Sequence, residues 1–275
     1  MRYARADYDQ GAWSWHGPYS LTDDNEGWAS GWFVNLDVGE VTCEELELDG
    51  DRVVAFAYTG VYDATTDYWG YRPLVGYWEP PGDGNHVPDF MIVNPDYPPE
   101  QWGSHYYAGW VCVDIPEDNT NNGGAAVVYI QDCEEEWPYG YQIFGISSLN
   151  PDFTWISVPS EEEEFDEATF PSLVVHCDGV NAAVTYFARS ESSDWVTYAT
   201  SWDLLYNSIA DPTEIDRYAS GEFEMDYYDQ MLHNWSTASK PAKYDSYTYW
   251  AAWSDKMEAT EPCEILGSMG FAYEQ

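Results

Sequence analysis

Ala183-Val184-Thr185-Tyr186-Phe187 is a short apolar run, and Trp195-Val196-Thr197-Tyr198-Ala199 is a second one. Between them lies an acidic loop that includes Glu191 and Asp194. β-Branched and aromatic residues favour strands, and a polar interruption of this length is typical of a connection between two strands. These residues therefore predict an antiparallel hairpin.

The same order of strand, acidic loop and strand recurs at residues 53–77, 126–145 and 249–267. Trp69 and Trp137 end the loop in two of these copies, as Trp195 does in the first hairpin, whereas the copy at 249–267 lacks the tryptophan. A short apolar stretch precedes each hairpin, at residues 46–48, 110–113, 173–176 and 231–235. Units of three or four strands that repeat about every 60–75 residues are typical of sheets arranged radially around an axis.

The repeat predicts an all-β fold in a single domain, residues 1–275, and specifically a β-propeller of four blades. Five blades are the alternative if residues 17–36 or 206–223 form a further unit, and a sandwich with long loops is another. The last unit runs to residues 271–273 and lacks an outer strand, while the strand-like residues 2–6 have no predicted partner. We therefore expect the N-terminal strand to join the last blade and close the ring.

The composition excludes several classes of function. The chain has 275 residues, of which 50 are Asp or Glu and nine are Lys or Arg, so its net charge is −41. Such a surface repels nucleic acid and anionic membranes, and no apolar run is long enough for membrane insertion. The aromatic fraction of 18% excludes a disordered acidic tail. Dense carboxylates are instead typical of a halophilic-type surface, or of a surface that gathers cations such as calcium.

The N-terminal residues contain no charged segment followed by an apolar one, so no signal peptide is visible. The protein either stays inside the cell or is the mature form of a secreted chain, and we expect an extracellular or cell-surface protein. The five cysteines are widely spaced, and their odd number leaves at least one thiol unpaired within the chain. Dispersed thiols are one interpretation, and one or two disulfides are the other: Cys43, Cys112, Cys133, Cys177 and Cys263.

One stretch matches a known turn pattern. Ser148-Leu149-Asn150-Pro151-Asp152-Phe153-Thr154-Trp155 keeps the serine, threonine and tryptophan of the pattern Ser-x-Asp-x-Gly-x-Thr-Trp. Shorter echoes are found at residues 9–13, at residues 201–203, and at residues 170–175 with Asp178 and Gly179. The chain therefore resembles the Asp-box, or bacterial neuraminidase repeat, propeller families. The resemblance implies a propeller in which the box joins the third and fourth strands of a blade, and it implies a fold rather than an activity.

The repeated loops suggest a carbohydrate site. Aromatic faces stack on the apolar side of a pyranose ring, and carboxylates accept its hydroxyl hydrogens. Tryptophans stand beside acids at the same place in three units: Trp69 with Asp67, Trp137 with Glu136, and Trp195 with Asp194. These residues predict a lectin-like ligand site, and packing between blades is the alternative role for the three indoles.

Enzymatic function is the runner-up, and no catalytic residue is assigned. A glycoside hydrolase or lyase needs a pair of carboxylates, and the sequence does not indicate which pair would serve. A sialidase is disfavoured because the six arginines do not occur in the context that those enzymes use, and because the surface would repel an acidic sugar. A structural or assembly subunit, with a protein interface made of aromatic residues, is the third class.

No cofactor is required by these patterns, but calcium fits the charge. The pairs Asp49 with Asp51 and Asp83 with Asn85 could supply oxygen ligands. None of them has the spacing of a complete calcium loop, and Asp-Gly is first of all a turn signal.

Overall fold

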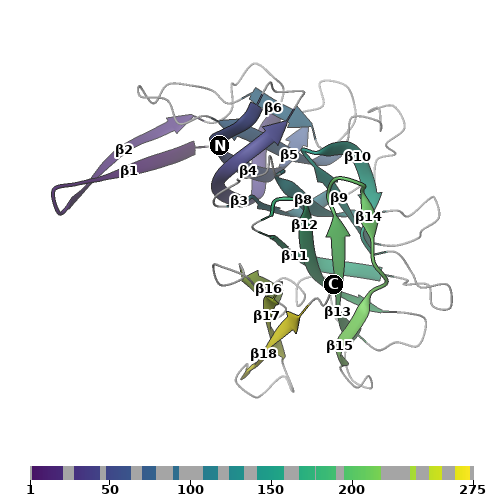
Figure 1. Cartoon of the computed structure of the whole chain (residues 1–275). Helices are drawn as coiled ribbons and strands as arrows, with labels where there is room; N and C mark the ends of the chain where they lie inside the picture. The colour runs from purple at the N-terminus through teal and green to yellow at the C-terminus, as the bar shows by residue number, and fades with distance from the viewer. Residues whose placement is uncertain are drawn as a thin grey trace.

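The computed structural model of the chain describes residues 2–20, 28–43, 48–62, 70–78, 89–92, 108–116, 124–132, 141–157, 167–176, 178–189, 195–217, 236–239, 248–255 and 264–272 (Figure 1). Every regular element in this part of the chain is a strand, so the predicted all-β class is confirmed.

Four antiparallel sheets follow one another along the chain, and in each of them consecutive strands pair, except that the last strand of the third sheet pairs with that sheet's third strand. The first contains β3 (Trp28–Cys43), β4 (Leu48–Tyr62), β5 (Gly70–Trp78) and β6 (Asp89–Ile92). The second contains β7 (Ala108–Asp114), β8 (Ala126–Asp132), β9 (Tyr141–Ser147) and β10 (Asn150–Trp155). The third contains β11 (Glu167–Val175), β12 (Asn181–Arg189), β13 (Trp195–Asp203), β14 (Ser208–Ile209) and β15 (Thr213–Arg217). The fourth contains β16 (Ser236–Ser239), β17 (Thr248–Asp255) and β18 (Glu264–Ala272).

The four predicted hairpins are confirmed as the pairs β4–β5, β8–β9, β12–β13 and β17–β18. The strand predicted at residues 46–48, before the first hairpin, is wrong. Leu48 is the first residue of β4, and the strand that precedes β4 is β3. The described residues of the two segments considered for a fifth blade belong to other sheets. They lie in β2 and β3, and in β14 and β15.

The N-terminal strand does not join the last sheet, so the expected mode of ring closure is wrong. β1 (Arg2–Asp9) pairs with β2 (Ala12–Ser20) in a separate two-stranded sheet that projects from the other sheets (Figure 1). The turn residues Gln10 and Gly11 both have positive φ, at 49° and 88°, which is the geometry of a two-residue hairpin turn. A partner two residues away requires far less loop-closure entropy than one at the other end of the chain.

Successive sheets pack through the first strand of the later one. β7 contacts β3, β4 and β5, β11 contacts β7, β8 and β9, and β16 contacts β11 and β12. As a result β12 is buried at seven consecutive positions, from Ala182 to Ala188, without the alternation of a sheet that has one wet face. The third sheet therefore has neighbours on both faces.

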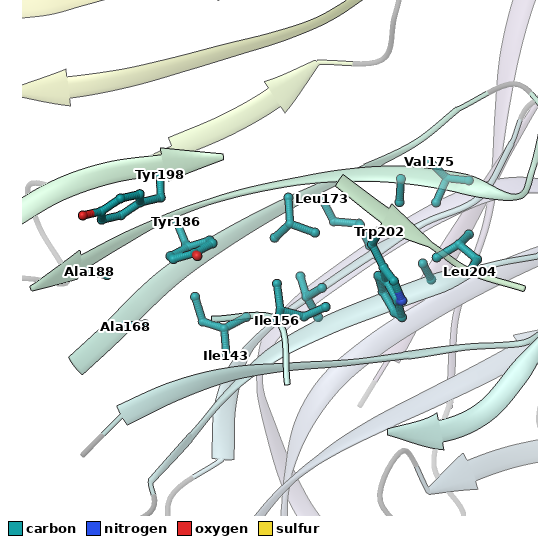
Figure 2. Close-up of a cluster of buried hydrophobic side chains, with 14 of the residues drawn as sticks. Ile143, Ile156, Ala168, Leu173, Val175, Tyr186, Ala188, Tyr198, Trp202 and Leu204 are labelled. Atoms are coloured by element: carbon teal, nitrogen blue, oxygen red, sulfur yellow. The ribbon is translucent and has the colours of Figure 1, made fainter. Parts of the chain in front are cut away.

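A cluster of buried hydrophobic side chains forms a core between the second and third sheets (Figure 2). Ile143 and Ile156 come from the second sheet and the segment after it, and they pack toward Tyr186 and Trp202 of the third. The Tyr186 and Tyr198 rings are stacked with centroids 6.0 Å apart. Burial of the apolar side chains in this layer is the main favourable contribution to the pairing of the two sheets.

Carboxylate and amide oxygens join the first strands of neighbouring sheets. The backbone N–H groups of Val113 in β7 and of Ile115 just after it donate to Asn35 Oδ1 (2.9 Å) and Asp37 Oδ2 (2.8 Å) of β3. One sheet further on, the Val175 N–H donates to Asp114 Oδ2 at 2.6 Å. These acceptors satisfy the N–H groups on the edge of β7 and β11 that the sheet itself leaves unpaired. We call this arrangement the edge seam.

Two glycines allow the sheets to approach closely. A Cβ atom on Gly39 of β3 would lie only 2.1 Å from the Pro116 carbonyl oxygen, across the contact between the first and second sheets. A Cβ atom on Gly145 of β9 would lie 2.8 Å from the indole of Trp202, a fully buried side chain. Both positions therefore exclude any larger side chain unless the sheets move apart.

The edge seam predicts a stability loss for Asp114→Ala. The variant leaves the buried Val175 N–H without this acceptor, which should lower the free energy of unfolding by about 1.5–3 kcal/mol. Asp114→Asn retains an acceptor oxygen and should lose less. Urea unfolding followed by circular dichroism measures the difference, and the exposed Asp152→Ala serves as control with a change below about 0.5 kcal/mol. Equal stabilities for Asp114→Ala and Asp152→Ala would show that the seam contributes nothing.

The packing of Trp202 predicts that Gly145→Ala destabilises the chain by about 1–3 kcal/mol, because the added methyl group overlaps the indole. The same substitution in a Trp202→Leu background should cost markedly less, since the smaller side chain frees the space. A double-mutant cycle on thermal or urea unfolding gives this coupling directly. An identical loss in both backgrounds would mean that the indole is not the obstacle.

Candidate functional site

The residues predicted to bind carbohydrate fall almost entirely outside the described part of the chain. This is so for Trp69, Trp137, Asp67, Glu136 and Asp194. Trp195 is the first residue of β13 and lies opposite Arg189 in the β12–β13 register. Residues 63–69 and 133–140 join the second and third strands of their sheets, as residues 190–194 do before Trp195, and the shared role of the three tryptophans stays a prediction.

A different group of connections comes together at the other end of β13. It contains residues 147–150 between β9 and β10, residues 178–181 between β11 and β12, and residues 203–207 between β13 and β14, and we call it the turn cluster. The Ser147 hydroxyl donates to the Leu204 carbonyl oxygen (2.9 Å), and the Leu204 N–H donates to the Val180 carbonyl oxygen (2.8 Å). The second and third sheets are thus joined here by hydrogen bonds as well as by their core.

Short polar side chains shape each turn from within. The Asp203 carboxylate accepts hydrogen bonds from the N–H groups of Leu205 (3.0 Å) and Tyr206 (2.9 Å). Asn150 Oδ1 accepts from the Asp152 N–H at 3.2 Å. Asp178 Oδ1 does the same for Val180 and Asn181. Such side chains fix a turn by replacing backbone acceptors.

Tyr206 is the aromatic residue that the turn cluster presents to solvent. Its side chain is 77% exposed, and the neighbouring Leu205 and Asp152 are exposed as well. Asn207 fixes the turn from two directions, because its Oδ1 accepts from the Trp202 indole N–H (3.0 Å) and its Nδ2 donates to the Asp152 carbonyl oxygen (2.9 Å). An aromatic ring on a fixed turn, with carboxylates nearby, is a suitable surface for a hydroxylated ligand.

Sequence reasoning missed Tyr206 because the signal is spread over two segments. The echo at residues 201–203 indicated a turn, but nothing in the sequence indicated that Asn207 would bond to residue 152 of another sheet. The shortened echo at residues 9–13 forms the turn between β1 and β2, which is a different place from the connection of third and fourth strands that the resemblance implies.

His176 and Asp178 form a polar pair at the turn between β11 and β12. His176 is buried, and its Nδ1 lies 3.1 Å from Asp178 Oδ2 and 3.2 Å from the Asp178 backbone nitrogen. A neutral imidazole accepts the backbone N–H at Nδ1, whereas a protonated one donates to the carboxylate. The His176 N–H and carbonyl also bond to Asn181 and Gly179, so the pair closes the β11–β12 turn.

Metal binding receives no support from the geometry of the described residues. In this part of the chain no group of three or more His, Cys, Asp or Glu is placed to hold an ion. Asp49 and Asp51 lie within β4, where a register shift places Thr42 opposite Asp49 and Val41 opposite Asp51, so Gly50 is the extra residue of a bulge. Asp83 and Asn85 lie outside the described residues.

Comparisons of the sequence with known proteins show no family for this chain. No protein-family model matches the chain, and no curated protein matches its sequence. The described residues also form no helix with the length and apolar character needed to cross a membrane.

Cys112 is a free thiol in the edge strand β7. Part of the residue reaches the surface, but its sulfur is enclosed and donates to the Pro171 carbonyl oxygen of β11 at 3.2 Å. Burial, followed by the negative charge of Asp114, raises the pKa of the Cys112 thiol from 9.0 to about 12. Because the thiolate is the reactive form, Cys112 should be inert in the folded protein at neutral pH.

This raised pKa predicts the pH dependence of Cys112 alkylation. In the urea-unfolded chain the rate should level off above pH 9, whereas in the folded protein it should keep rising toward pH 12. The unfolded thiol ionises first, so this group also favours the unfolded state as the pH rises between those two values. Iodoacetamide labelling read at the Cys112 peptide by mass spectrometry measures both profiles. A folded-state midpoint near 9 would contradict the burial of the sulfur.

Proposed function

We propose that this protein is a carbohydrate-binding module of the extracellular space or the cell surface, built as a four-bladed β-propeller, and that it binds its ligand without catalysing a reaction. The described sheets support the fold in this proposal. Consecutive strands pair in each sheet apart from β15, which pairs with β13, and each later sheet packs on the preceding one through its first strand. In the second and third sheets, Asn150 and Asp203 shape the turn between third and fourth strands, as the acid of an Asp box does.

The exposure of Tyr206 on a turn that Asp203 and Asn207 fix carries the binding part of the proposal. A ring held in place loses little conformational freedom when a sugar stacks on it, so more of the contact energy contributes to affinity. Asp152 is exposed beside it and can accept hydrogen bonds from hydroxyl groups. The net charge of −41 favours neutral sugars over acidic ones.

The tryptophans of the repeated loops remain the second candidate surface. Trp195 begins β13, at the opposite end of that strand from the turn cluster, and the other members of this set lie outside the described residues: Trp69, Trp137, Asp67, Glu136 and Asp194. Trp195 begins β13 and Tyr206 follows its end, so the two candidate surfaces are separated by about 30 Å of strand. Point variants can therefore decide between them.

A glycoside-cleaving enzyme and a structural subunit are the two alternative functions. A glycoside hydrolase or lyase would cleave the ligand with a carboxylate pair, which aryl glycosides would reveal as turnover. A structural or assembly subunit would bind no sugar at all. Calcium stays a prediction based on charge, with Asp49, Asp51, Asp83 and Asn85 as its candidate ligands.

A panel of neutral oligosaccharides, measured by calorimetry, tests the proposal. Tyr206→Ala should weaken binding by about 1–3 kcal/mol and leave the melting temperature unchanged, because the ring is exposed. Trp13→Ala is the matched control, since it removes another exposed aromatic ring far from the turn cluster. If the repeated loops bind instead, Trp195→Ala should have the larger effect on affinity. If the loop tryptophans only pack between blades, the same change should cost about 3–5 kcal/mol of stability.

Absence of binding across the panel, with Tyr206→Ala behaving like the parent protein, would contradict carbohydrate recognition at the turn cluster. Cleavage of aryl glycosides by the parent protein would replace the binding module with the enzyme. Binding without turnover, turnover, and neither binding nor turnover thus correspond to the binding module, the enzyme and the structural subunit.

A further inference from the structure

The β1–β2 hairpin forms an arm that exposes two tryptophans. Trp13 and Trp15 are 66% and 74% exposed, and they alternate along β2 so that both lie on the same face of the hairpin. The turn at Gln10 and Gly11 is at the far end of the arm, and the ends of the hairpin lie near the other sheets (Figure 1). An exposed pair of indoles on a projecting element is unusual unless a partner covers it.

The arm also has little to stabilise it by itself. A two-stranded hairpin is marginally stable in water, because it has no layer on which to bury an apolar face. Nearly all of the side chains described between Asp9 and Pro18 are exposed, and only His16 is half-buried. A second layer against the Trp13 and Trp15 face would supply the missing burial.

The first sheet offers an apolar face of matching spacing. In β3, Asn35 and Asp37 point to the edge of β7, while Leu36 and Val38 alternate with them and are 55% and 40% exposed. Trp13 and Trp15 are two residues apart in their strand, and so are Leu36 and Val38. Each pair is therefore spaced by about 7 Å. At residues 35–38, one face of β3 is thus used in the edge seam, and Leu36 and Val38 on the other face are exposed.

Charge favours the arm as the part of the chain that approaches a second copy. Residues 1–20 contain Arg2, Arg5, Asp7 and Asp9 and no other Lys, Arg, Asp or Glu, so the arm is neutral. The whole net charge of −41 therefore lies on residues 21–275. Contacts between two acidic bodies are repulsive, whereas a neutral arm can reach an acidic body without that penalty.

We propose that the protein forms a symmetric dimer by arm exchange, in which Trp13 and Trp15 of each copy pack on Leu36 and Val38 of the other. The partner is a second copy because the arm cannot cover its own β3. Trp13 lies opposite Tyr8, which places it roughly 20 Å from the base of the hairpin at Arg2, and the arm points away from β3 in Figure 1. Exchange of an arm between identical chains is a simple route to a closed dimer, because each copy contributes both the arm and the face.

Sedimentation velocity of the full chain over a wide range of protein concentration tests the proposal. The dimer fraction should rise with concentration and with NaCl up to about 1 M, where screening acts over about 3 Å and the repulsion between bodies is reduced. Trp13→Ser with Trp15→Ser, and separately Leu36→Ser with Val38→Ser, should each raise the dissociation constant of the dimer at least about tenfold. Leu205→Ser with Tyr206→Ser is the matched control, because it removes two exposed apolar side chains elsewhere and should leave the dissociation constant unchanged.

Mixing the two variants identifies the contact. The arm variant keeps an intact β3 face, and the face variant keeps an intact arm, so an equimolar mixture should form a heterodimer that neither variant forms with itself. All variants should keep the melting temperature of the parent monomer, because the substituted side chains are exposed.

A chain that stays monomeric at every concentration and salt level overturns the proposal, and so does a mixture that fails to associate. Loss of association in the arm variant alone would mean that the arm docks on another surface, which overturns the assignment to β3. A change in tryptophan fluorescence of the monomer with neutral oligosaccharide, abolished by Trp13→Ser with Trp15→Ser, would make the arm a sugar site instead.

Discussion

The edge of each inner strand is the constraint on which the arrangement of the sheets depends. A first strand such as β7 or β11 pairs with its own sheet on one side and leaves N–H groups unpaired on the other. The preceding sheet supplies the acceptors, with Asp37 bonded to Ile115 and Asp114 bonded to Val175. β7 receives such acceptors from β3 and supplies the next one to β11, so these contacts fix the order of the first three sheets. In a chain with 50 acidic residues, a few carboxylates thus have an internal, structural use.

The sequence was informative wherever local pattern determines structure. Short β-branched and aromatic runs correctly predicted all four hairpins, because neighbouring strands pair across short loops. The N-terminal strand was assigned to the wrong partner, since residues 12–20 combine Gly, Pro, Ser and two tryptophans and did not indicate a strand. The edge seam was also missed, although Asp37-Val38-Gly39-Glu40 and Asp114-Ile115-Pro116-Glu117 are similar tetrapeptides. An acidic residue that will be buried cannot be told from the many that remain at the surface.

The candidate site depends on contacts that no local pattern encodes. Tyr206 is presented to solvent because Asp203 fixes the turn from within and Asn207 connects it to the second sheet. The first of these interactions spans three residues and can be read from the sequence, whereas the second spans 55 residues and follows only from the stacking of the sheets. The site of tryptophans beside acids in the repeated loops stays a prediction, and Tyr206 could be located only from the tertiary structure.

The packing of sheets through their first strands divides the chain into two kinds of position. First strands such as β7 and β11 contribute the contacts of the edge seam, and Gly39 in β3 and Gly145 in β9 leave no room for a larger side chain. The exposed side chains of Leu205 and Tyr206 take no part in the edge seam, whereas the adjacent Leu204 is buried in the core. Substitutions can accumulate at such exposed positions without altering how the sheets stack. The proposed recognition surface and the contacts that hold the sheets together therefore use different side chains, so the surface is free to diverge while the stacking is kept.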